Sequence, residues 1–85
     1  MNNNEELQHG CRVEYGPLEL RIQVSASSSR FIVYVEDPRL EHACVSEQTV
    51  QCSLESAKES AVLRADEYLN GRNEASQHAA EWRCS

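Results

Sequence analysis

Two pairs of histidine and cysteine come nearest to a metal site in this chain of 85 residues. His9 and Cys11 form one pair, and His42 and Cys44 form the other. Residues two apart in a strand point to the same side, so each pair could bind a metal from one face. Together they would supply the Cys2His2 ligands of a structural zinc site. The alternative is two exposed histidines and two ordinary thiols, and we favour it because zinc ligands are usually grouped more closely, so no metal is predicted.

A cysteine nucleophile needs a lowered pKa and a nearby base. Cys52 precedes a predicted helix start, where the helix dipole would stabilise a thiolate, but nothing in the sequence places His42 or His78 beside it. The serines at 27–29 are not flanked by the glycines of a nucleophile elbow. The chain has three glycines and no phosphate-binding loop, so we expect neither a cofactor nor enzymatic activity.

The charge of the chain indicates which partners it can bind. Its formal net charge is −6, from 14 acidic and 8 basic side chains, and Lys58 is the single lysine. Binding to DNA or RNA requires clustered basic residues, so direct binding to nucleic acid is not expected. A protein partner with a basic surface fits the charge better.

The N-terminal stretch is polar and acidic, without the features of a signal peptide. We expect residues 1–9 to be a disordered tail and residues 10–85 to form a single domain. No apolar run is long enough to span a bilayer, so we expect a cytoplasmic protein without a membrane association. Cysteines in that compartment are usually reduced thiols. Should the four cysteines pair instead, sequence alone leaves three pairings open.

Alternating apolar and polar residues predict the strands. Leucine, isoleucine and valine occupy every second position over 18–25, which is typical of a strand with one buried face. A polar turn at 26–29 leads to a second strand at 30–36, and weaker patterns predict strands at 12–15 and 44–51.

An apolar stripe at helical spacing follows, from Leu54 to Leu69. Ser53 is suited to cap the start of this helix, and Gly71 could take the left-handed conformation that ends it. Asn73 could cap a shorter second helix that reaches Trp82. The sequence therefore predicts an α+β fold: a three- to four-stranded antiparallel sheet, one main helix at 53–70 packed on one face, and a short C-terminal helix.

The exposed side of the main helix is a candidate binding surface. Glu55, Glu59 and Asp66 cluster on the helical wheel, and Leu63 lies beside them, roughly opposite the buried stripe. An apolar residue next to acidic ones could dock a basic partner. The alternative is an ordinary solvated helix face.

Ile32 and Tyr34 form a second candidate surface. If the helix covers Phe31, Val33 and Val35, these two residues lie on the opposite face of the sheet. Exposed apolar side chains on a sheet usually contact something, which predicts a partner or a homodimer through this face or the sheet edge. The alternative is that the C-terminal helix folds back and Trp82 covers them.

Three segments carry a family resemblance: residues 31–38 (FIVYVEDP), residues 43–45 (ACV) and residues 49–61, with the run SLESA. Together they resemble the HicB-like antitoxin domain, which has a strand, an Asp-Leu-Pro-Gly-Cys turn, a second strand and a helix rich in glutamate and alanine. This chain lacks the glycine of that turn and the DNA-binding extension of many HicB proteins. The resemblance implies a non-catalytic, dimeric domain that blocks a small basic toxin.

These observations predict a small, acidic protein-interaction module that regulates or neutralises a protein partner, as an antitoxin does. The alternative is an acidic inhibitor that blocks a nucleic-acid-binding target, such as an anti-CRISPR protein from a phage. The expected contact residues are Ile32, Tyr34, Glu55, Glu59, Leu63 and Asp66.

Overall fold

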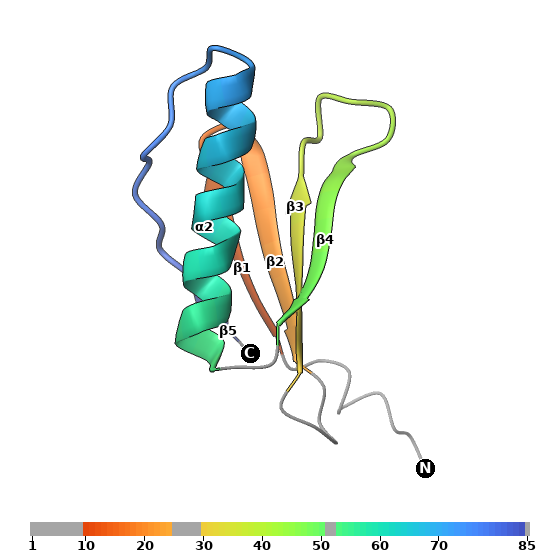
Figure 1. Ribbon diagram of the computed structural model, residues 1–85, viewed down its shortest axis with the longest axis vertical. Helices are drawn as coiled ribbons and strands as arrows, with labels where there is room; N and C mark the ends of the chain where they lie inside the picture. The colour runs from red at the N-terminus through yellow and green to blue at the C-terminus, as the bar shows by residue number, and fades with distance from the viewer. Residues whose placement is uncertain (1–9, 25–29, 51–52, 85) are drawn as a thin grey trace.

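The computed structural model describes residues 10–24, 30–50 and 53–84, and it shows an α+β fold. Four strands come first along the chain: β1 (Gly10–Tyr15), β2 (Leu18–Val24), β3 (Phe31–Glu36) and β4 (Cys44–Val50). The helix α2 (Leu54–Gly71) and the short strand β5 (Arg83–Cys84) follow. The strands form one antiparallel sheet in the order β4-β3-β2-β1-β5, with α2 across one face (Figure 1).

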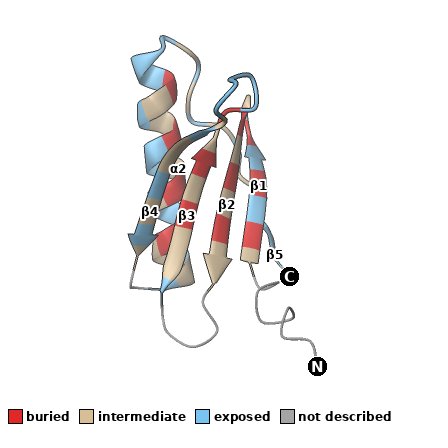
Figure 2. Ribbon diagram, turned by 90° about the vertical axis from the view of Figure 1, so that its right-hand side faces the viewer, coloured by how far each residue is buried: buried red, intermediate tan, exposed pale blue. Residues whose placement is uncertain are grey.

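The core lies between α2 and the sheet because apolar residues alternate along the strands, as the sequence predicts. The buried strand residues are Cys11, Val13, Tyr15, Leu18, Leu20, Ile22, Val33 and Val35. From the helix, Ala57, Ala61, Ala65 and Leu69 recur at every fourth position and are fully buried. Three of these four are alanines, whose small side chains let the helix lie close to the sheet. The opposite face of the sheet is not covered by the helix (Figure 2).

Both ends of α2 are capped, and only the N-terminal cap is the predicted one. Ser53 caps the start as predicted, since its hydroxyl accepts a hydrogen bond from the backbone N–H of Ser56 at 3.1 Å. At the other end, the left-handed residue is Asn73, with φ 58°, and not Gly71. The N–H of Glu74 donates to the carbonyl of Leu69 at 2.8 Å, which completes a Schellman motif. Asn73 thus ends the main helix instead of starting another.

The predicted second helix is wrong. Residues 74–82 form no regular element and run back beside α2 to β5, which pairs with β1 (Figure 1). The N–H groups of Gln77 and His78 donate to Asp66 and Tyr15, and Gln77 has φ 64°, so this backbone cannot continue as a helix. Two long-range hydrogen bonds therefore outweigh the helix propensity of the alanines.

The sheet has five strands, so the predicted count of three to four is too low. The missing strand is β5, and a disulfide between Cys11 and Cys84 joins it to β1. The expectation of reduced thiols is wrong for these two cysteines. The predicted tail at 1–9, the turn at 26–29, and Cys52 lie outside the described residues. Within the described part of the chain, no helix is both long and apolar enough to cross a membrane.

Candidate functional site

A row of exposed residues follows the outer side of α2. Glu55, Glu59, Leu63 and Glu67 recur at every fourth position, each two residues before a buried residue of the core stripe. They therefore face away from the sheet. Leu63 is 59% exposed, although leucine is among the residues most often buried. We call these four residues the acidic ridge.

The carboxylates of the acidic ridge make few contacts within the chain. Glu55 lies 3.8 Å from the ammonium of Lys58, which is a loose contact at the surface. Among the described residues, the side chains of Glu59 and Glu67 make no hydrogen bond and no ion pair. The helix thus presents negative charge on both sides of one exposed apolar side chain.

Asp66, predicted for this surface, is turned toward the C-terminal segment. Its carboxylate accepts hydrogen bonds from the hydroxyl of Tyr15 at 2.7 Å and from the backbone N–H of Gln77 at 2.9 Å. Burial of the Tyr15 hydroxyl and its hydrogen bond to Asp66 raise the pKa of Tyr15. Asp66 therefore positions residues 74–82, and Glu67 takes its place on the ridge. The helical wheel gives the direction of Asp66 but cannot show which segment covers it.

Ile32 and Tyr34 lie on the face of the sheet that α2 leaves open, as predicted, and both are partly exposed. The guanidinium of Arg21 lies 4.4 Å from the centre of the Tyr34 ring, and the Tyr34 hydroxyl is 3.4 Å from Gln23 Oε1. Trp82 packs against the core and does not cover these residues. Side chains of the neighbouring strand β2 cover them in part instead.

The strand register sorts the charges of this open face into two rows. Arg12 lies directly opposite Arg83 on β5 and Arg21 on β2, and we call these three residues the arginine row. One step along the strands, Glu14 lies opposite Glu19, which lies opposite Glu36. We call these three glutamates the glutamate row.

Two ion pairs connect the rows within one chain. Arg12 Nε lies 3.2 Å from Glu19, and Arg21 Nη2 lies 3.0 Å from Glu36. The hydrogen bond to Glu36 raises the pKa of Arg21. These diagonal pairs offset part of the repulsion between like charges on neighbouring strands.

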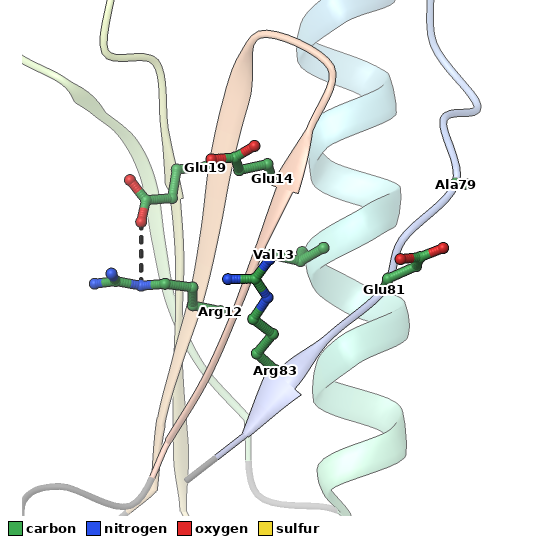
Figure 3. A pocket seen from close by; sticks show the side chains of 7 residues that line it. All are labelled: Arg12, Val13, Glu14, Glu19, Ala79, Glu81 and Arg83. Atoms are coloured by element: carbon green, nitrogen blue, oxygen red, sulfur yellow. Dashed lines mark ion pairs between the residues drawn. The ribbon is translucent and has the colours of Figure 1, made fainter.

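A groove of about 330 Å³ opens where the two rows reach the β1–β5 edge (Figure 3). It is lined by Arg12, Val13, Glu14, Glu19, Ala79, Glu81 and Arg83. Among the described residues, Glu14, Glu81 and Arg83 are in no ion pair. Charged side chains of both signs that lack partners suit this groove to binding another charged surface.

A second polar cluster holds the β3–β4 loop against α2. The carboxylate of Asp37 is fully buried and accepts hydrogen bonds from Arg39 Nε at 2.8 Å and from the hydroxyl of Tyr68 at 2.7 Å. The Arg39 guanidinium holds the pKa of Asp37 well below its usual range. Arg39 also pairs with Glu74 at 2.9 Å, so one arginine links the loop to the segment after the helix.

The His-x-Cys pairs do not form the zinc site considered from the sequence. Cys11 is in the disulfide and cannot supply a thiolate, while His42 and Cys44 are exposed in and after the β3–β4 loop. The described residues contain no group of three or more potential metal ligands. A disulfide is typical of oxidising compartments, so the Cys11–Cys84 bond counts against the cytoplasmic location, which stays a prediction.

Comparisons with known proteins give no relative for this arrangement. No family model matches the chain, and neither the curated proteins nor the solved structures contain a significant match. The resemblance to the HicB-like antitoxin domain therefore stays a prediction, and the family of the chain is not shown.

Proposed function

We propose that the protein is a non-catalytic interaction module that neutralises or regulates a partner with a basic surface. The acidic ridge of α2 is the contact surface in this proposal. The observation that carries it is Leu63, 59% exposed between glutamates whose carboxylates are almost free of partners. The net charge of −6 supports the same partner class, and the resemblance to HicB-like antitoxins suggests a small basic toxin.

The ridge combines two contributions to binding. Burying a leucine side chain at an interface is worth about 1.5–3 kcal/mol, which corresponds to roughly 10–150-fold in affinity. The glutamates on both sides would pair with lysine or arginine of the partner and would increase the association rate. An apolar contact within a ring of charges is the usual arrangement of a protein interface.

The test is an affinity capture in the native host with matched variants of the bait. We compare the wild-type protein with Leu63→Asp and with Glu59→Lys on the ridge, and with Glu47→Lys on β4 as control. Glu47 is exposed but lies on the other face of the sheet. We expect to recover a basic protein with the wild type and with the control. The amount of this protein recovered should be at least tenfold lower with either ridge variant. Equal retention on all four baits would refute the proposal.

Salt dependence separates this function from the inhibitor of a nucleic-acid-binding target. An acidic mimic binds mainly through charge, so its affinity should fall steeply as salt is raised. An interface centred on Leu63 should keep most of its affinity in 0.5 M NaCl. We favour the second outcome because the ridge has an apolar residue at its centre.

A further inference from the structure

We propose that the open face of the sheet binds a second copy of the chain through its arginine and glutamate rows. The pattern of charge on this face is unusual for a sheet that remains alone. Like charges lie directly opposite each other at four positions: Arg12 with Arg21 and with Arg83, and Glu19 with Glu14 and with Glu36. Such pairs are destabilising within one sheet. Two diagonal ion pairs offset this cost only in part, because Glu14 and Arg83 are left without a pair among the described residues.

A two-fold axis can satisfy both rows at once. We consider two open faces packed against each other, with the axis parallel to the rows and midway between them. Rotation by 180° then places each strand over the same strand of the second copy and exchanges the rows. Arg12 of one copy lies over Glu14 of the other, and Arg21 lies over Glu19. Every contact occurs twice, as in any isologous interface.

The alternative axis is excluded by charge. If the two-fold axis ran along the strands, each row would lie over itself, with arginine against arginine and glutamate against glutamate. Like-charge contacts of this kind strongly oppose association. The striped face is therefore complementary to a second copy in one orientation only.

The size of the face predicts the strength of the dimer. Five strands about 4.8 Å apart make a face roughly 20 Å wide, so the buried area falls at the lower end of specific interfaces. We expect association in the range of tens to hundreds of micromolar, with a marked dependence on salt. The acidic ridges of both copies point away from this interface, so the dimer is independent of the proposed partner binding.

Arg12 and Glu14 offer a sharp test because reversing either charge is tolerated within the chain. In Glu14→Arg the new arginine lies opposite Glu19, and in Arg12→Glu the new glutamate lies between Arg21 and Arg83. In the dimer, each variant places two like charges over each other twice. Sedimentation equilibrium from 10 to 500 µM in 50 mM NaCl should show self-association weakened by at least tenfold in both variants, with unchanged far-UV circular dichroism.

Mixing the two variants should restore the complex. In a heterodimer, both charges of the Arg12→Glu chain are negative and both charges of the Glu14→Arg chain are positive, so both contacts between positions 12 and 14 are attractive. Native mass spectrometry of an equimolar mixture should show the heterodimer in excess of either homodimer. Glu59→Arg, on the far side of α2, is the control because it makes the same change of net charge as Glu14→Arg. This variant should associate as the wild type does.

Three results would overturn the proposal. The first is a wild-type protein that remains monomeric up to 500 µM at low salt. The second is a dimer that responds equally to Glu14→Arg and Glu59→Arg, which would indicate an effect of net charge. The third is an equimolar mixture that yields no heterodimer, since the two-fold arrangement requires one.

Discussion

Replacing Asp37 by asparagine is expected to lower the free energy of unfolding by about 2–3 kcal/mol at pH 7. The carboxylate is fully buried and accepts four hydrogen bonds, three from Arg39 and one from the hydroxyl of Tyr68. Breaking a buried ion pair costs about 3–5 kcal/mol. The loss expected here is at or below the lower limit of that range, because Arg39 is 43% exposed and keeps its ion pair with Glu74.

The pH dependence of the unfolding free energy tests whether the lost stability comes from the ionised carboxylate of Asp37. The pKa of Asp37 is lowered in the folded protein, chiefly by its hydrogen bonds from Arg39, from an ordinary value of 3.8. A lowered pKa contributes stability that is present above the unfolded value and is lost as the pH falls toward the folded value. The difference between the wild type and Asp37→Asn should therefore be constant above about pH 5 and should narrow between about pH 4 and pH 2.

Urea unfolding followed by the helix signal in circular dichroism measures both effects. For a chain of this length, a loss of 2–3 kcal/mol also corresponds to a melting temperature lower by about 11–17 °C. Glu47→Gln, the same type of change on an exposed side chain, is the control and should cost less than about 0.5 kcal/mol. The reasoning is refuted if Asp37→Asn is as stable as the wild type at pH 7, or if the gap widens in acid.

Substitutions at three further sites test other parts of the fold. Cys84→Ser removes a cross-link between residues 73 apart and should cost up to about 4 kcal/mol in thermal or urea unfolding, whereas Cys44→Ser, at a free and exposed thiol, should cost little. Gly16→Ala should cost about 1–2 kcal/mol by urea unfolding, because Gly16 has φ 59° and a Cβ there would lie 2.5 Å from Nε2 of His78; the double variant with His78→Ala should recover part of the loss. Asn73→Gly should be neutral or slightly stabilising in the same assay, while Asn73→Ala should destabilise by about 1 kcal/mol, and the reverse order would contradict the Schellman motif.

The strands and the main helix could be predicted because each carries its own periodic pattern. Residues 18–24 alternate strictly, and the alanines of α2 recur every four residues, so local sequence determines which side faces the core. The capping serine could be recognised for the same reason, since its effect extends over three residues only.

The C-terminal segment could not be predicted because its conformation depends on distant residues. Ala75, Ala79 and Ala80 favour a helix locally, but Asp66 and Tyr15 bind the backbone of this segment. Strand β5 has two residues and therefore no period. The one signal for it is the even number of cysteines, which allowed a disulfide without indicating its partners.

The charged rows could in part have been found from the sequence. The short turn at Gly16 and Pro17 fixes the register of β1 and β2, so the pairing of Arg12 with Arg21 and of Glu14 with Glu19 follows from it. The contributions of β3 and β5 depend on a turn of uncertain length and on a disulfide, and they require the structure.

The bond between Cys11 and Cys84 converts nearly all of the described chain into a covalent ring. One proteolytic cut inside this ring opens it but releases no fragment, so the nicked molecule keeps its full mass until a reductant is added. During synthesis the ring can close only after residue 84 has left the ribosome, when the other strands and the helix have already been made. The edge of β1 thus remains open until residues 83 and 84 have been made, and the disulfide can form only after the other strands and the helix have been synthesised.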